Sequence, residues 1–523
     1  MPSGRNAFLL VLTAVCLLAA ACRKDDIERT PEAFGSIRLQ ASSVELTPGG
    51  SAEIAFSVQD GGFSRVSLCL ADGTPPQYFS LAGFDKVADG QYVATVSDNG
   101  VATDYSQEAC IVISTEGQLD IASERICVNC GKTYYPEMTD TGLPVVYLDT
   151  DGGRSFYPGN IELPAVLKIR GTEKYAGLRP LSCTVEGHGN ISRLWDKKPC
   201  RLTLRDSVPM LGMPPGKHWL LLANFADRTL MRNMVAMKVA SLTSLCWTPR
   251  CVPVELVLNG SHQGTYLLIE KVEVDEHRLN LQGDGSFLLE LDFHYDNERQ
   301  WMDPHGLSRN KLGIPFAIAY PAPRDLSAGE EARIKQYITD LADLLYSDSF
   351  ADPEEGYAKW LDEDSFADYW IVYEVLGNHE LANPGSIYFH RNADGRLEAG
   401  PCWDFDICLR GYITTAQEWT GLLNRDAIWY SRLFRDPAFV QKVRLRYQEL
   451  LPQLQGVADY IDECGKLLEA SAGLNFAMWD PTQDRWQNGG LLINGDEDLE
   501  FGQAVQKLRE VYLRRLELVS KSL

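Results

Sequence analysis

The sequence has few basic side chains and, after its first residues, no long apolar run. Its 523 residues include 49 Lys and Arg against 72 Asp and Glu, which gives a formal net charge of -23. Nucleic acids and anionic membrane surfaces repel such a chain, so neither is expected as its primary partner. Beyond the leader no segment offers the ~18 or more apolar residues of a membrane span. With 45% hydrophobic residues, the chain is instead expected to fold into several domains.

Motifs for a closed zinc site and repeats of solenoid length are also missing. Cys127 and Cys130 form a Cys-x-x-Cys without a second pair, and no His follows at a zinc-finger interval. A local disulfide or two buried thiols therefore fits better. Of the thirteen cysteines, Cys16 and Cys22 belong to the leader, and the remaining eleven cannot all pair because their number is odd.

The first residues predict export. Arg5 precedes the apolar run 7–18, and three alanines stand directly before Cys22. This pattern is typical of a bacterial lipoprotein signal over residues 1–22, with Cys22 as the lipidated residue; the alternative is a plain secretory signal. Residues 23–34 then form a tether that begins with charged side chains. We expect a protein anchored by lipid to the outer membrane, outside the cytoplasm and exposed at the surface.

Residues 35–131 are predicted to form a small β-sandwich. Short runs in which polar and apolar residues alternate, such as 51–58 and 92–96, are separated by turns rich in Gly, Pro and Asp. Regularly spaced short strands of this kind are typical of immunoglobulin-like domains. No group of residues in this part carries recognisable chemistry, so we interpret it as a spacer or a binding module.

The pattern becomes mixed from residue 140 to residue 523. Apolar runs and one Asn-Gly turn predict strands at residues 145–148, 166–169, 201–204, 219–223, 254–258, 266–270 and 287–291. Helices are expected after a cap at Asp227, from a capping box of Ser327 and Glu330 to Tyr346, from a cap at Asp364 or Ser365 to Gly377, and over residues 429–450, 456–471 and 498–521.

The stretch from Asn378 to Asp406 holds three carboxylates that attract attention. Glu380 lies just past a predicted helix end, and Asp404 and Asp406 flank Phe405 after a short strand and a turn. In an extended segment Asp404 and Asp406 share a face, because side chains alternate with period two. Adjacent anions repel unless a cation lies between them, and hard divalent ions bind carboxylate oxygens. The pattern predicts a Mg²⁺ site for nucleotide phosphates; the alternative is an acidic pair at a turn, one member capping a helix.

Several segments, taken in order, resemble the CotH (spore-coat protein H) kinase family, whose members are secreted or surface proteins. The resemblance covers about residues 140–450. It rests on GHGN at 187–190, KKP at 197–199 with Arg201, LGMP at 211–214, WLLLAN at 219–224 with Asp227 and Arg228, MRN at 231–233, residues 254–260, YLLIEK at 266–271, LELD at 289–292, the Asn-x-Glu at 378–380 and GPCWDFD at 400–406.

The resemblance implies an α+β protein in which an atypical protein-kinase-like domain follows the small all-β domain. It also implies transfer of the ATP γ-phosphate to hydroxyl groups of a protein substrate with Mg²⁺ or Mn²⁺. Asp404 and Asp406 would occupy the metal position, and Glu380 the position of the catalytic carboxylate. The implied candidates for nucleotide binding are Lys198 and Arg201 on the phosphates, Glu270 holding a lysine in place, and Trp403 stacking on adenine.

Two departures from the family pattern concern catalysis. Glu380 stands where Asp is common; its extra methylene moves the carboxylate by roughly 1.5 Å, and misplacement by about 1 Å can cost ~10²-fold in rate. The family's Arg-Gly-Arg-Gly-Asn run appears here as Glu186-Gly187-His188-Gly189-Asn190, without either arginine. The alternative function is therefore a catalytically silent adhesin or scaffold, or a glycan-binding protein, on the same fold, with a surface glycan or protein as its partner.

Overall fold

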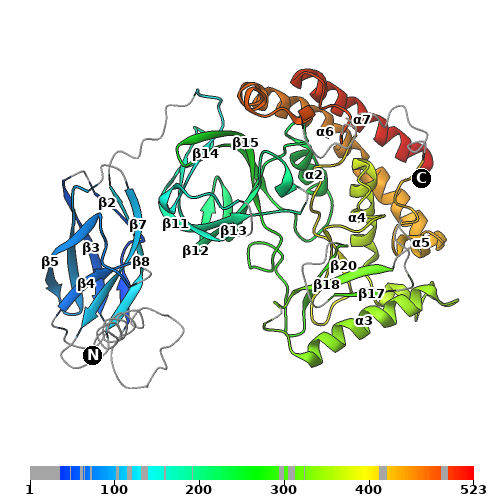
Figure 1. The fold of residues 1–523 in the computed structure, drawn as a ribbon. Helices are drawn as coiled ribbons and strands as arrows, with labels where there is room; N and C mark the ends of the chain where they lie inside the picture. The colour runs from blue at the N-terminus through cyan, green and yellow to red at the C-terminus, as the bar shows by residue number, and fades with distance from the viewer. Residues whose placement is uncertain are drawn as a thin grey trace, which may run out of the picture.

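A computed structural model shows three parts that follow one another along the chain (Figure 1). It describes residues 36–523 except 47–48, 59–62, 64, 71–72, 102–104, 115–119, 131–138, 158–160, 191, 294–299, 304, 306–312, 323, 411–420 and 484–492. The predicted signal with Cys22, and the tether, lie outside the described residues. Within the described part, no helix combines the length and apolar character needed to cross a bilayer.

The first part is a sandwich of two four-stranded sheets, which confirms a strand-rich region ahead of the mixed part. Apolar residues of both sheets, among them Phe56 and Val96 of one and Ile111 and Val128 of the other, form a common core. The first sheet has the order β1 (Ile37–Leu39), β3 (Ser51–Val58), β6 (Gln91–Asp98) and β5 (Phe79–Ala88); the second has β2 (Ser43–Leu46), β8 (Ile121–Cys130), β7 (Tyr105–Ser114) and β4 (Arg65–Cys69).

The second part is a closed seven-stranded barrel. Alternate side chains point inward, so Leu202, Trp219, Leu221 and Leu268 are all buried in one core. The hairpin predicted at Asn259-Gly260 is present, with Asn259 at φ 50° and Gly260 at φ 75°. Around the barrel the strands are β10 (Leu163–Arg170), β11 (Leu178–Gly187), β12 (Cys200–Met210), β13 (Met213–Leu222), β15 (Ser261–Glu270), β14 (Cys251–Leu258) and β9 (Val145–Thr150).

The third part combines a five-stranded antiparallel sheet with helices, and its buried residues form the largest core. The order of the strands is β17 (Gln300–Asp303), β18 (Ile314–Tyr320), β16 (Phe287–Leu291), β19 (Ile387–Arg391) and β20 (Glu398–Ala399). The helices are α2 (Arg232–Ala240), α3 (Ala328–Tyr346), α4 (Glu363–Leu376), α5 (Tyr430–Leu433), α6 (Pro437–Met478) and α7 (Phe501–Ser522). In Figure 1, α6 and α7 run side by side along the edge of this part.

The helix boundaries differ from the sequence predictions in several places. The helix predicted over residues 429–450 is interrupted, since α5 ends at Leu433 and α6 begins at Pro437. Helix α4 is capped by Asp362, whose side chain accepts the N–H of Ser365, and not by Asp364 or Ser365. Helix α2 begins at Arg232, five residues after Asp227.

The two helices expected on either side of residues 451–455 form the single helix α6, which contains Pro452. Burial of Leu450, Leu454 and Val457 along one face continues across the proline, and this packing outweighs the lost backbone hydrogen bond. The capping box of Ser327 and Glu330 is confirmed.

Candidate functional site

The two aspartates lie in a loop that leaves strand β20 and passes the C-terminal end of helix α4. Asp404 has a left-handed backbone with φ 61°, so the expected extended segment is wrong at this residue. Aspartate tolerates this conformation better than bulky or β-branched residues do. The carboxyl groups of Asp404 and Asp406 nevertheless meet and share a hydrogen bond. The turn thus brings together the two groups that a strand would have placed on one face.

Three buried asparagines hold this loop. Asn378 donates from Nδ2 to the carbonyl of Asp404 (3.2 Å) and accepts the N–H of Glu380 on Oδ1 (2.7 Å). Asn233 of α2 accepts the N–H of Phe405 (2.9 Å), and Asn494 donates to the carbonyl of Asp406 (3.1 Å). One side chain, that of Asn378, therefore fixes Glu380 relative to Asp404. It can do so because α4 ends at Gly377, whose φ of 59° turns the chain out of the helix.

Glu380 lies against the aspartate pair. Burial raises the pKa of its carboxyl well above the usual range, and the nearby charges of Asp404, Asp406 and Asp292 raise it further. Its Oε2 is buried and has no hydrogen-bond partner among the described residues. Burial likewise raises the pKa of Asp404 to about 6 and that of Asp406 well above its usual value. Four carboxyl groups, one of them not predicted from the sequence, thus form an acidic cluster of Asp292, Glu380, Asp404 and Asp406.

A buried arginine adjoins the acidic cluster. Arg232 is fully buried, forms ion pairs with Asp227 and Asp496, and donates from Nε to the carbonyl of Cys408 (2.8 Å). Asp227 also accepts the N–H groups of Thr229 and Arg232 ahead of α2, but it is not the N-cap expected from the sequence, because that position is Met231. The charge of Arg232 lowers the pKa of Asp406, although burial outweighs it. This ion-pair network joins α2 to the acidic loop and to residue 496.

The two predicted phosphate ligands on the barrel are engaged in other contacts. The ammonium of Lys198 donates to the carbonyl of Trp195 (2.6 Å) and lies 5.2 Å from the ring centre of Tyr157. Arg201 forms an ion pair with Glu186, the residue opposite it on β11. Neither contact includes a carboxylate of the acidic cluster.

Glu270 and Trp403 are also placed by packing. Glu270 is fully buried, and its Oε2 accepts the backbone N–H and the Nε of Arg250 at 2.8 and 2.9 Å, so its recorded partner is an arginine and not a lysine. Trp403 is 8% exposed and belongs to the core of the third part. The remaining predicted site residue, Cys22, lies outside the described residues.

A lysine that was not among the predicted site residues lies at the end of barrel strand β15. Lys271 directly follows β15, and burial lowers the pKa of its ammonium. The charges of Glu273 and Glu290 raise this pKa, and the charge of Arg201 lowers it. Glu290 accepts a hydrogen bond from the hydroxyl of Tyr388 (2.6 Å). Burial and the charge of Glu290 raise the pKa of Tyr388, as do the charges of Asp292 and Asp404. Glu290 thus acts on Lys271 and also binds Tyr388, which the charges of Asp292 and Asp404 affect in turn. In the sequence, Lys271 and Asp292 each follow a predicted strand directly and end a segment that carries the family resemblance, YLLIEK and LELD, but neither was assigned a role in the site.

The pair of Asp404 and Asp406 offers oxygen ligands to a hard divalent cation. Carboxylates of the acidic cluster repel one another when ionised, and a buried oxygen of Glu380 lacks a partner among the described residues, but no three of the four groups bring ligand atoms within 4.8 Å of one another. Asp404 and Asp406, which share a hydrogen bond, would hold the ion. Mn²⁺ takes the same kinds of ligand as Mg²⁺.

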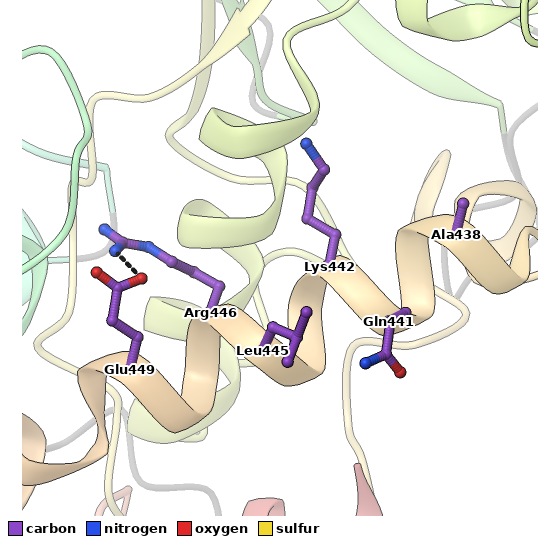
Figure 2. A pocket seen from close by; sticks show the side chains of 6 residues that line it. All are labelled: Ala438, Gln441, Lys442, Leu445, Arg446 and Glu449. Carbon is purple, nitrogen blue, oxygen red and sulfur yellow. Dashed lines mark ion pairs between the residues drawn. The ribbon is translucent and has the colours of Figure 1, made fainter.

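A separate hollow of about 530 Å³ lies on the outer face of α6 (Figure 2). All its lining residues come from this one helix. Arg446 in the hollow already pairs with Glu449 (2.9 Å) and with Asp368 (2.7 Å). Leu445, a large apolar side chain in the hollow, is 55% exposed. None of the predicted site residues belongs to this surface.

A closed barrel and an antiparallel sheet packed with helices define a protein of the α+β class. The family model described as CotH kinase protein matches residues 185–519, which is more than half of the chain. The chain therefore belongs to the CotH kinase family. No curated protein matches it. Among solved structures, it is similar to the N-terminal Ig1-2 module of the Drosophila receptor protein tyrosine phosphatase DLAR, with 10% identity over 35% of this chain and 96% of that one and a TM-score of 0.15.

Proposed function

We propose that the protein is an atypical protein kinase that transfers the γ-phosphate of ATP to a hydroxyl group of a protein substrate. The observation that carries the proposal is the buried acidic cluster, because four carboxyl groups in one place are costly without a bound cation. Membership of the family points in the same direction. A divalent ion held by Asp404 and Asp406 would neutralise charge on the phosphates when it is bound.

Glu380 is proposed as the group that orients the acceptor hydroxyl. Burial and the charges of the neighbouring aspartates raise the pKa of its carboxyl. A bound cation would offset those charges and favour the ionised form, which can accept the proton of the hydroxyl. Asn378 holds it in place through the N–H of Glu380 and the carbonyl of Asp404. The longer side chain of Glu is compatible with this role if the loop is built around it.

Lys271 is proposed as the phosphate contact in place of Lys198 and Arg201. Its ammonium makes no hydrogen bond or ion pair to any residue that the structure describes, whereas the other two cations already have partners. An unpaired cation close to carboxylates that bind a metal is suited to an anionic nucleotide.

The test of this function is transfer of labelled phosphate from ATP, either to the protein itself (autophosphorylation) or to a generic acceptor protein. Glu380→Gln should leave nucleotide binding nearly intact and lower transfer by ~10²-fold or more, because the amide cannot accept the proton. Glu380→Asp should also slow transfer, since a site adapted to Glu loses the correct distance. Glu449→Gln, which changes an exposed carboxylate on α6, is the matched control and should behave as wild type.

Equal transfer by wild type and Glu380→Gln would contradict the role of Glu380. Absence of transfer in wild type while ATP still binds would favour the second candidate, a silent adhesin or scaffold that has kept the fold. Higher transfer by Glu380→Asp would identify a decayed aspartate site.

We also propose, from the leader alone, that lipid on Cys22 anchors the protein to the outer membrane. The sandwich would then act as a spacer or binding module for a surface glycan or protein.

A further inference from the structure

A second group of metal-binding side chains lies at one edge of the C-terminal sheet. His390 on β19 is directly opposite Glu398 on β20 in the antiparallel register. Cys246 reaches them from the segment between α2 and β14. The Sγ of Cys246 is 3.2 Å from Nε2 of His390, and that nitrogen is 3.5 Å from Oε2 of Glu398. The ligand atoms of all three residues lie within 4.8 Å of one another.

The imidazole of His390 is oriented as a ligand would be. Its Nδ1 lies 3.1 Å from the carbonyl oxygen of Gly400. A carbonyl only accepts, so Nδ1 carries a proton. Burial lowers the pKa of His390, but the hydrogen bonds to Cys246 and Glu398 outweigh it and raise that pKa to about 10, so a metal would have to displace a second proton from Nε2, the nitrogen that faces both residues. A backbone carbonyl that fixes the second ring nitrogen is the usual support for a histidine bound to a metal. The side chain is only 2% exposed, so its orientation is held by packing.

Cys246 is exposed, yet the segment that carries it is anchored. The backbone N–H and hydroxyl of Ser244 both donate to Asp368 on α4, at 2.7 and 2.6 Å. On the other side of the cysteine, Trp247 is buried. The thiol is therefore held against His390 while it remains accessible to an ion from solvent.

We propose that Cys246, His390 and Glu398 form a binding site for Zn²⁺, with water as the fourth ligand. Tetrahedral coordination at bond lengths of ~2.0–2.3 Å separates the ligand atoms by about 3.3–3.6 Å, close to the separations found here. A thiolate with an imidazole selects zinc over Mg²⁺, so this site differs in chemistry from the acidic cluster.

The position of the site gives the ion a structural role. It would tie the segment between α2 and barrel strand β14 to the edge strands β19 and β20. The carbonyl that orients His390 belongs to Gly400, the residue that opens the loop of the acidic cluster. No sequence motif reveals the site, because 144 positions separate Cys246 from His390.

The experiment is titration of the full chain with Co²⁺ and then Zn²⁺. Co²⁺ should give a thiolate-to-metal charge-transfer absorption at one equivalent per chain, and Zn²⁺ should displace it. Cys246→Ser should abolish this absorption, and Glu398→Gln should weaken Zn²⁺ binding by about tenfold or more, because even partners that only orient a ligand are worth 10–100-fold in affinity. Because Cys246 is exposed, its replacement by serine is expected to leave the fold intact.

Two controls make the outcome decisive. Cys251→Ser changes a nearby half-buried thiol outside the site and should retain the absorption. Asp406→Asn alters the acidic cluster and should retain it as well. The proposal is overturned if wild type gives no thiolate absorption with Co²⁺, or if the absorption survives in Cys246→Ser.

Discussion

At the scale of single residues, the acidic cluster is notable for carboxyl groups that are hard to ionise. Burial raises the pKa of Asp404 to about 6, and it raises the pKa values of Asp406 and Glu380 well above their usual range. Because these groups share one neighbourhood, they titrate together, and a cation that stabilises their ionised forms must displace protons. Metal binding at this site is therefore expected to depend on pH.

Stability should respond to pH in opposite directions with and without the metal. A raised pKa in the folded state gives stability that is present below the unfolded value, near 4, and is lost as pH rises through about 6 for Asp404. With a chelator, the protein should melt at a higher temperature at pH 5 than at pH 7.5. The stabilisation by Mg²⁺ should shrink as pH falls, because protons compete for the carboxylates.

Melting curves with chelator and with Mg²⁺ at pH 5, 6 and 7.5 check this prediction. The matched comparison is Asp406→Asn, in which the Mg²⁺ effect should be small at every pH. A Mg²⁺ stabilisation that is the same at pH 5 and 7.5 would show that the ion does not bind these carboxylates.

At the scale of secondary-structure elements, a buried ion pair joins helices α4 and α7. Arg515 and Glu374 are 1% and 0% exposed, and their charged atoms are 2.5 Å apart. The carboxylate of Glu374 also accepts the N–H groups of Leu423 and Asn424. Asn424 in turn donates to the carbonyl of Asn378, the residue that positions Glu380. The pair thus supports the site although it lies outside it.

Arg515→Met should destabilise the protein by about 3–5 kcal/mol, because it leaves the carboxylate of Glu374 buried without its counter-charge. Lys521→Ala, on the same helix, removes an exposed cation and is expected to change stability by less than ~0.5 kcal/mol. Chemical denaturation of both variants measures the difference. Similar losses in the two would mean that the buried pair contributes no more than a surface contact.

Most elements could be predicted from local patterns. The hairpin at Asn259-Gly260 and the capping box at Ser327 depend on residues adjacent in sequence, and both are present. The single helix α6 was predicted as two, because Pro452 is a local signal to stop, whereas the burial that overrides it comes from tertiary packing. Likewise, the sequence could not reveal the left-handed turn at Asp404, which asparagines from three separate segments hold in place.

At the scale of the whole molecule, the acidic cluster depends on chain segments far apart in sequence. Asp404, Asp406 and Glu380 could be found because they lie within one stretch. The parts played by Asp292, Lys271 and Asp496, the ion-pair partner of Arg232, could not be found in this way. These residues are far apart in sequence, and only the three-dimensional arrangement brings them near the site. The N-terminal sandwich is joined to the barrel by contacts such as those of Ser43 with Pro180 and of Arg205 with Arg125.

The central claim is that Asp404 and Asp406 hold a divalent ion that carries ATP. The measurement that tests it most directly is the thermal stability of the full chain with ATP, in the presence and absence of Mg²⁺ or Mn²⁺. Ligand binding to the folded state stabilises it by about 2.7 kcal/mol at a hundredfold excess over Kd. Wild type should show this stabilisation only with the metal, and Asp406→Asn should lose it, since a neutral amide is a poorer ligand for a hard cation.

Asp426→Asn, an exposed aspartate outside the acidic cluster, should keep the full effect. The account predicts that stabilisation by ATP requires both the metal and Asp406. Absence of any stabilisation in wild type with either metal, or an undiminished one in Asp406→Asn, would contradict it.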